Sequence, residues 1–345
     1  MSILAFFKRA ESLTLDEAME LHRLRLLRRE RHTMRRMERA WRIAEAAINR
    51  DLVALLAVIA NAESPDYAFG MGWIGQQERY TDLLATIGRE IDRYAAFAAT
   101  ETTLGQERAI VAAIQEGHVA EKAALREAKV KGALARLDPA IMRHLVGTMS
   151  DGSPLTELFR TIGPAMVRKA RLIFEEEVPK GTGSRKIGKR IEKELGTSRR
   201  RGETIARTEV NRCYRATRLE SLRKRPDLWE GWMWQSALDK RTCPICWGMH
   251  GTVYGLDKDW PGSHPVCRCA MRPLAKGRVR KTEATGDEVF AKLDEKDQKA
   301  ILLNPGRFEA YKSVGSLSGM VMDTRHDRWG TGKRLIPLNK LVVEK

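Results

Sequence analysis

Long apolar runs, aromatic side chains and a nucleotide-binding loop are scarce or missing in this chain of 345 residues. Aromatic residues make up only 6% of it, although hydrophobic residues reach 43%, which is enough for a core. No segment approaches the roughly 18 apolar residues of a membrane span, and the five before Lys8 are too few for a signal peptide. We therefore expect a soluble protein made in the cytosol, with no membrane partner.

The absence of a G-x-x-x-x-G-K-S/T loop excludes the phosphate cradle of a P-loop ATPase. Energy for any process that the protein serves is expected to come from another protein. No small-molecule substrate is predicted.

Cysteine is present in a pattern typical of zinc sites. Cys243 and Cys246 form a C-x-x-C pair, and seventeen residues separate Cys246 from a second pair, His264 and Cys267. Two ligands at i and i+3 can both reach one tetrahedral ion, so these four residues are the predicted zinc ligands. Cys269 is the alternative to His264 as fourth ligand.

Four protein ligands leave no position for water, so the predicted zinc is structural and not catalytic. The loop from Val253 to Pro265 has little apolar surface, and metal binding would supply the stability that it lacks. The alternatives are thiols that are only buried or that pair as disulfides. Cys213, on a predicted helix, is expected only to pack.

Tryptophan is concentrated just before this pattern. Five of the eight Trp residues lie between Trp229 and Trp260, and Trp232 and Trp234 share one face of a predicted strand. We expect these rings to form a core over the metal loop, the alternative being that they stack on nucleic-acid bases.

The net charge of +17 arises in two stretches. Residues 22–42 hold nine Arg against two Glu, and residues 185–225 hold fifteen Lys or Arg against five Glu. Such an excess attracts a polyanion without sequence preference, or an acidic surface of a partner protein. The predicted contacts to nonspecific double-stranded DNA or a partner are Arg185, Lys186, Lys189, Arg190, Arg199, Arg200, Arg201, Arg212, Arg215 and Arg218.

Apolar periodicity predicts a mainly α-helical chain with a small α+β module. Residues 1–150 are expected to form a helical region, beginning with a long helix whose apolar face runs from Leu27 to Leu55. Residues 151–274 would form the module with the zinc knuckles, and residues 275–345 a tail that is helical and then partly extended. Residues 61–75 are expected to break the helical pattern, and Asp138 to cap a new helix.

A basic helical hairpin is predicted at the start of the cysteine module. Ser184 would cap a short helix ending near Leu195, and Thr197 or Ser198, after Gly196, would cap a second that ends before Pro226. Its charges are spread around the helices, which favours contact with a nucleic-acid backbone over base recognition.

The order of these motifs resembles the phage head morphogenesis family, the Mu F-like minor head proteins of tailed bacteriophages. The resemblance spans about residues 154–274 and rests on three stretches, I-A-R-T-E-V-N-R-C-Y-R from Ile205, D-K-R-T-C-P-I-C from Asp239 and H-P-V-C-R-C from His264. It implies a minor component of the virion head without enzymatic activity, assembled in the host cytoplasm and associated with the portal and other head proteins. The alternative is a zinc-dependent DNA-processing enzyme, an HNH-like nuclease with His250 as base, although residues 253–269 contain no Asn for its second metal position.

Overall fold

The structure is a computed structural model that describes residues 12–62, 71–262, 264–277, 284–326 and 330–341. Helices dominate it, as predicted, and two small antiparallel sheets complete it. The apolar residues before Lys8 and most of the predicted break at 61–75 lie outside the described residues. No described helix is long and apolar enough to cross a lipid bilayer.

The chain divides into two compact units, each assembled from separate stretches of sequence. Unit 1 comprises residues 1–29, 106–152 and 210–345, and unit 2 comprises residues 30–105 and 153–209. Three long helices contribute to both units: α2 (Leu15–Ala62), α4 (Glu78–Glu127) and α7 (Ser184–Arg223).

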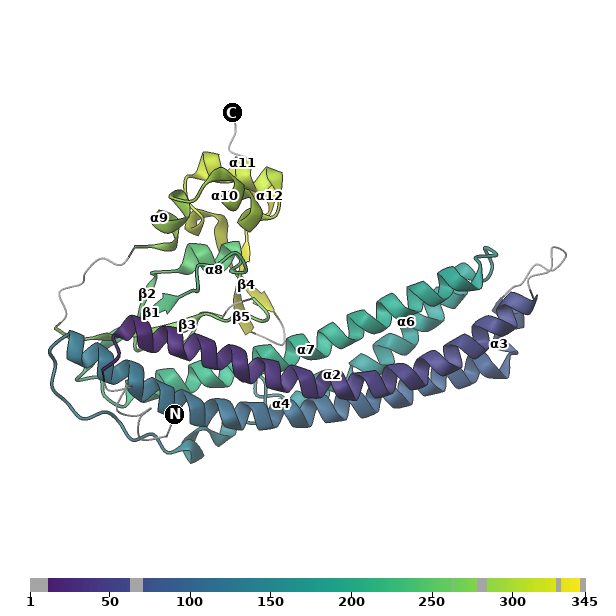
Figure 1. Ribbon diagram of the computed structural model, residues 1–345, viewed down its shortest axis with the longest axis horizontal. Helices are drawn as coiled ribbons and strands as arrows, with labels where there is room; N and C mark the ends of the chain where they lie inside the picture. The colour runs from purple at the N-terminus through teal and green to yellow at the C-terminus, as the bar shows by residue number, and fades with distance from the viewer. Residues whose placement is uncertain (1–11, 63–70, 263, 278–283, 327–329, 342–345) are drawn as a thin grey trace. The chain divides into compact units, whose positions relative to one another are not determined.

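Unit 2 is a bundle of helices, drawn in purple to teal in Figure 1. It combines parts of the three long helices with α3 (Met71–Gly75), α5 (Leu155–Arg160) and α6 (Ile162–Glu177). The predicted apolar face of α2 is confirmed, because Met37, Trp41, Ala44, Ile48, Leu52 and Leu55 are all buried.

Aromatic edge contacts join the helices of unit 2. The ring of Trp41 meets that of Tyr94 at 4.9 Å, and Tyr80 of α4 meets Phe174 of α6 at 5.4 Å. A Cβ atom at Gly202 of α7 would lie only 2.7 Å from the hydroxyl of Tyr94, so a glycine is required where α7 approaches α4.

Unit 1 contains a three-stranded sheet in the order β2-β1-β3. β1 (Trp229–Gln235) pairs antiparallel with β2 (Val253–Gly255) and with β3 (Ala270–Ala275). The predicted tryptophan strand is therefore confirmed. Gly231 lies where β1 pairs with β2, and a Cβ atom there would be only 2.1 Å from the carbonyl oxygen of Tyr254.

The predicted helical hairpin at Gly196 is wrong, because α7 is a single helix from Ser184 to Arg223. The Thr197 hydroxyl donates to the Lys193 carbonyl within the helix and does not cap a new one. Ile191 and Leu195 are buried before the glycine and Ile205 after it. Burial of this continuous apolar face outweighs the cost of one interior glycine, about 1 kcal/mol. By contrast, the predicted cap at Asp138 is confirmed, and it begins the 3-10 helix η1 (Pro139–Leu145).

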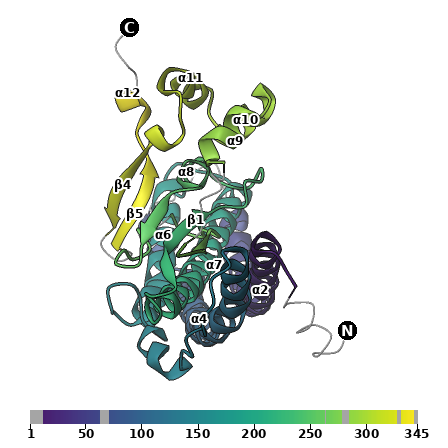
Figure 2. The same ribbon diagram turned by 90° about the vertical axis from the view of Figure 1, so that its left-hand side faces the viewer.

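The C-terminal tail is more structured than the sequence indicated. It forms α9 (Gly286–Ala291), α10 (Glu295–Leu302), α11 (Pro305–Val314), η2 (Ser318–Met320) and α12 (Leu338–Leu341). Its extended part is a hairpin of β4 (Val321–His326) and β5 (Gly330–Leu335), seen side by side in Figure 2. Phe290, Ile301, Phe308, Leu317 and Met320 form a core of their own with Trp247.

Candidate metal centre

The C-x-x-C pair begins the short helix α8 (Pro244–Met249). Cys243 is the N-cap residue, and its sulfur accepts the backbone N–H of Cys246 at 3.4 Å. Pro244 occupies the first helical turn, where backbone N–H groups have no partner within the helix, so the N–H that proline lacks costs no hydrogen bond. This cap turns the sulfurs of Cys243 and Cys246 toward the same point.

His264 faces both sulfurs. Its Nε2 atom lies 3.0 Å from Cys243 Sγ and 3.1 Å from Cys246 Sγ. Its Nδ1 atom lies 2.7 Å from the carbonyl oxygen of Pro265, so Nδ1 carries the proton and donates it. The Nε2 lone pair is then directed at the sulfurs, which is the tautomer that a metal-binding histidine adopts.

A backbone turn brings Cys267 to the same place. Val266 has a φ of 59°, an unusual value for a β-branched residue, and it reverses the chain between His264 and Cys267. Cys267 Sγ lies 3.7 Å from Cys246 Sγ. Two sulfurs bound to one tetrahedral zinc at about 2.3 Å would be about 3.8 Å apart, so the observed separation fits a shared ion.

Cys269 belongs to a second, overlapping group of three. Cys243, Cys246 and His264 form one group of potential ligands, Cys246, Cys267 and Cys269 form the other, and within each group the atoms lie within 4.8 Å. Cys269 Sγ also lies 3.2 Å from the Ser236 hydroxyl, which donates to the Cys246 carbonyl at 2.6 Å. Cys269 is thus the alternative ligand, and its sulfur already has the Ser236 hydroxyl as a hydrogen-bond partner.

The cluster holds charge without a metal. Hydrogen bonding with Cys246 lowers the pKa of Cys243 to about 5, against burial and with the help of His264. Burial by itself would lower the pKa of His264, but hydrogen bonds with Cys243 and Cys267 raise it to about 10. Burial raises the pKa of Cys269. Without a metal the arrangement favours a thiolate beside an imidazolium, and loss of the imidazolium proton on metal binding gives the thiolate and imidazole donors that zinc binds.

Two side chains of α7 hold the backbone of the second knuckle. Asn211 Nδ2 donates to the Cys267 carbonyl at 3.1 Å, and Arg215 donates to the carbonyls of Cys267 and Cys269 at 2.5 and 3.0 Å. The Arg215 guanidinium also lies over the Trp260 ring, 4.5 Å from its centre. This support was not predicted from the sequence, although Asn211 and Arg215 are spaced i and i+4 on one helix face.

The tryptophans form the core around the cluster, as predicted. Trp232 and Trp234 are fully buried, and the Trp260 ring stacks on both at 5.3 and 4.0 Å. Cys246, Cys267 and Cys269 belong to the same core. The rings are therefore engaged within the protein, which contradicts the alternative that they stack on nucleic-acid bases.

Trp247 connects this centre with the C-terminal core. Cys246 packs with the tryptophans, whereas its neighbour Trp247 packs against Phe290 at 5.7 Å. The Asp287 carboxylate accepts backbone N–H groups of Leu317 and Ser318 on the same side of α8. One short helix thus contributes to two cores.

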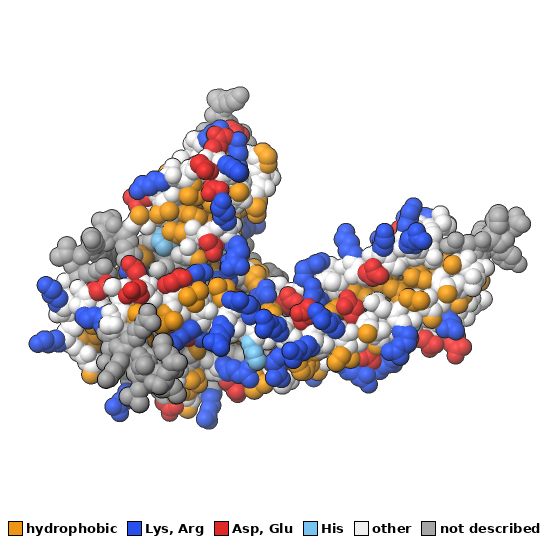
Figure 3. Space-filling model, viewed as in Figure 1, with side chains coloured by type: hydrophobic (Ala, Val, Ile, Leu, Met, Phe, Trp, Pro, Cys, Tyr) orange, Lys and Arg blue, Asp and Glu red, His pale blue; other side chains and the backbone are white. Residues whose placement is uncertain are grey.

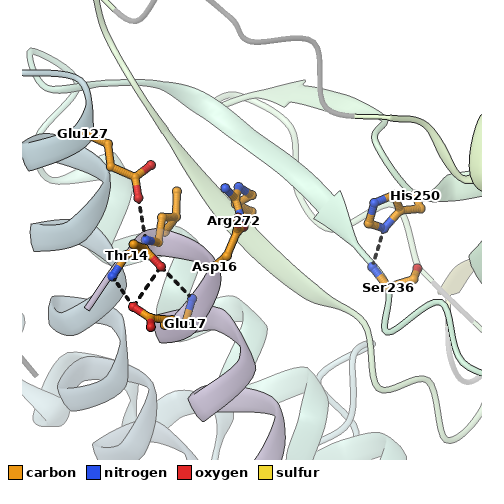
Figure 4. Close-up of polar contacts among 8 residues, drawn as sticks. Thr14, Asp16, Glu17, Glu127, Ser236, His250 and Arg272 are labelled. Atoms are coloured by element: carbon orange, nitrogen blue, oxygen red, sulfur yellow. Dashed lines mark hydrogen bonds and ion pairs between the residues drawn. The ribbon is translucent and has the colours of Figure 1, made fainter.

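His250, the base of the nuclease hypothesis, has another role in the structure (Figure 4). Its Nδ1 atom accepts the backbone N–H of Ser236 at 3.0 Å, which holds the end of β1. Burial and the nearby charge of Arg272 lower its pKa. The buried Arg272 is itself paired with Asp16. Neither group of potential metal ligands among the described residues includes His250.

The ten predicted basic contacts fall into two classes. Arg215 and Arg218 are buried, and Arg218 pairs with the buried Glu121, so the prediction that they contact DNA or a partner is wrong. Arg212 is half-buried and donates to the Thr148 carbonyl at 2.6 Å. These arginines instead bind groups within unit 1. The remaining seven lie on the part of α7 in unit 2, and six are exposed, with Arg199 half-buried: Arg185, Lys186, Lys189, Arg190, Arg199, Arg200 and Arg201.

Comparison with known families addresses the part of the chain that holds this centre. Residues 169–272 match the family model of the phage Mu protein F like protein. The resemblance expected from the motifs is confirmed over this Mu F-like segment. No curated protein and no solved structure matches the chain.

The Mu F-like segment begins within α6 and ends within β3. It therefore includes β1, β2, the start of β3, α8, all five potential ligands and the two residues of α7 that support them. The C-terminal core lies beyond it, apart from Trp247. The family is one of phage head proteins, and the segment that defines it here is the segment that contains the cysteine cluster.

Proposed function

We propose that this protein is a minor structural component of a bacteriophage head that acts in head morphogenesis, near the portal. The match of residues 169–272 to the Mu F-like family is the observation that supports this function. Its partners would be the portal and other head proteins, with nonspecific contact to packaged DNA. It would assemble in the host cytoplasm and remain in the virion.

Within that function, the cysteine cluster is proposed to hold one structural zinc ion. Cys243, Cys246, His264 and Cys267 are the proposed ligands, because His264 presents Nε2 to two sulfurs and the separation of Cys246 from Cys267 fits tetrahedral zinc. When bound, the ion would join α8 to the knuckle after β2. A complete protein ligand set leaves no position for a reacting water, which favours a non-enzymatic role.

Metal analysis tests the proposed zinc site. We expect one zinc per chain by elemental mass spectrometry, and loss of the folded tryptophan fluorescence when a chelator removes it, because the tryptophans pack on the ligands. Protein that holds no metal, or that loses it without any change in fluorescence, would contradict a structural zinc.

Two variants decide the fourth ligand. His264→Ala should abolish stoichiometric zinc binding, whereas Cys269→Ser should retain one zinc per chain, since Cys269 already has Ser236 as partner. The opposite result would assign Cys269 to the ion in place of His264.

The proposed role in the head is tested in the phage that encodes the protein. Purified heads should contain the chain in few copies by quantitative mass spectrometry. An amber mutation in its gene should yield defective heads, and wild-type protein supplied in trans should restore them. Normal infectious particles without the protein would exclude a role in morphogenesis.

A further inference from the structure

Arginine is the only basic residue of α2 apart from two histidines. The helix contains ten Arg and no Lys. Five of them define what we call the arginine face: Arg31, Arg35, Arg39, Arg42 and Arg50. All five are exposed and lie in unit 2. At 3.6 residues per turn they fall within an arc of about 100°, so they form one straight row.

Most arginines elsewhere on the helix are engaged within the protein. Arg23 pairs with Glu20, Arg29 with Glu116, and Arg36, about 40° beyond the row, with the buried Glu101 at 2.7 Å. In the arginine face, Arg42 pairs with Glu38 of the same exposed surface, an interaction worth only a few tenths of a kcal/mol. Among the described residues, Arg35, Arg39 and Arg50 have no acidic partner. These three residues therefore present guanidinium groups that pair with no carboxylate of the fold.

The basic surface of α7 differs in its arrangement. Arg190 donates to the carboxylates of both Glu176 and Glu177, and Arg199 lies 3.9 Å from Glu203. The other five cations of this surface are exposed and have no acidic partner among the described residues: Arg185, Lys186, Lys189, Arg200 and Arg201. At 3.6 residues per turn they are spread over an arc of about 160°, and two of them are lysines, so they do not form a row of arginines like that of α2. Exposed Lys and Arg side chains are distributed along the long helices in Figure 3.

We propose that the arginine face of α2 is the surface that binds the phosphate backbone of double-stranded nucleic acid. From Arg31 to Arg50 the row extends about 28 Å, at 1.5 Å per residue. Duplex DNA carries one charge per about 1.7 Å of its axis, so a row of this length spans most of a helical turn and faces the phosphates of both strands where they border a groove. Guanidinium groups bind phosphate oxygens bidentately, which suits arginine better than lysine.

The other side chains near the row favour a duplex over a protein partner or a single strand. Ile43 and Val53 are 72% and 66% exposed, but isolated exposed apolar residues are normal and do not make the apolar centre of a protein interface. The exposed positions of α2 from Arg31 to Arg50 include no Phe, Tyr or Trp, the large rings that single-strand binding uses for base stacking, and His32 supplies their one imidazole. The expected binding is therefore independent of sequence and sensitive to salt.

Two matched variants test the assignment on full-length protein. One is Arg35→Gln/Arg39→Gln/Arg50→Gln, and the control is Arg185→Gln/Lys186→Gln/Lys189→Gln, which removes the same charge from α7. The probe is a labelled 30-base-pair duplex of arbitrary sequence, titrated from about 50 to 200 mM salt. We expect the α2 variant to reduce the slope of log affinity against log salt by about three, one for each lost contact, and the control by less than one.

The assignment is overturned if both variants weaken binding equally, since net charge alone would then account for it. An unchanged α2 variant overturns it too. Poly-glutamate that competes as well as unlabelled duplex at equal charge would instead assign the face to an acidic protein surface. Circular dichroism and melting temperature verify that each variant is folded.

The inference rests on the proposed function in that packaged DNA is the duplex a head protein meets. The inference and the proposed function can be contradicted separately, because zinc content and incorporation into heads do not depend on the arginine face. A variant that keeps both and loses duplex binding supports the inference. Failure of the wild type to enter heads, with duplex binding intact, would contradict only the proposed function.

Discussion

The two units are stabilised in different ways, although three helices contribute to both. Unit 2 buries apolar faces of long helices, with Trp41, Ile48 and Leu55 of α2 fully or almost fully covered. Unit 1 has short strands, and its sheet packs on a cluster of cysteines and tryptophans. Long helices can bury enough surface to be stable without help, whereas a three-stranded sheet with loops needs a further link. We therefore expect removal of metal, and acid, to destabilise unit 1. Shortening a core side chain should destabilise unit 2 whether or not metal is bound.

The largest effect is expected from Cys246→Ser. Cys246 belongs to both groups of potential ligands, and structural zinc contributes about 10–16 kcal/mol of apparent binding energy in small metal-dependent domains. Hydrogen exchange should show loss of protection over residues 229–275 with protection in unit 2 retained. A soluble variant with normal exchange in both units would show that unit 1 does not depend on the cluster. Cys213→Ser, a buried cysteine outside the cluster, is the control.

Trp41→Ala should destabilise unit 2 by about 3–5 kcal/mol, the usual cost of removing a buried Trp. The loss should be the same with and without chelator, as measured by denaturant unfolding with hydrogen exchange over residues 30–62. Ile43→Ala, on the exposed side of the same helix, should change stability by less than about 0.5 kcal/mol. Dependence of the Trp41 effect on metal would mean that the units do not differ as proposed.

Acid should destabilise unit 1 partly through Glu116. Burial by itself would raise its pKa, but hydrogen bonds from His22 and Arg29 outweigh burial and lower the pKa to about 2. Because the folded pKa is below the ordinary value of 4.5, the stabilisation is complete above about pH 4.5 and is lost as the pH falls toward 2.

Glu116→Gln should remove this part of the acid dependence and cost about 2–4 kcal/mol at pH 7, as measured by urea unfolding across pH. Metal release in acid destabilises the wild type and the Glu116→Gln variant alike, so it cancels when the free energy of unfolding of one is subtracted from that of the other. Glu38→Gln, at an exposed carboxylate, should leave the profile unchanged. Identical profiles for Glu116→Gln and wild type would contradict the role of Glu116.

The smallest effect is expected from Gly196→Ala, which should stabilise the protein by about 0.5–1 kcal/mol. In a continuous helix, alanine is favoured over glycine, and a Cβ atom there meets only the end of Arg200, at 3.9 Å. A thermal melt with circular dichroism measures the change. If the variant were less stable than the wild type, the result would support the turn that was predicted from the sequence at this position and contradict a continuous helix.

Several parts of the fold followed from local patterns. The apolar face of α2, the tryptophan strand and the cap at Asp138 depend on neighbouring residues, which the sequence shows directly. The turn at Gly196 failed because glycine and threonine indicate a break only where packing does not favour a helix. The C-terminal core was missed, although the capping box of Thr285 and Glu288 was visible in the sequence, since its partner Trp247 is remote in the chain.

The sequence by itself determined the candidate ligands, the helical character and the Mu F-like resemblance, because each depends on residue type and spacing along the chain. Only the tertiary structure decided which charges are free. Arg215 and Arg218 look in sequence like Arg35 and Arg39, yet the first two are buried against carbonyl groups and Glu121, and the others are exposed without an acidic partner among the described residues. A charged side chain is buried only where a distant part of the chain supplies its partner, and that proximity is a property of the fold.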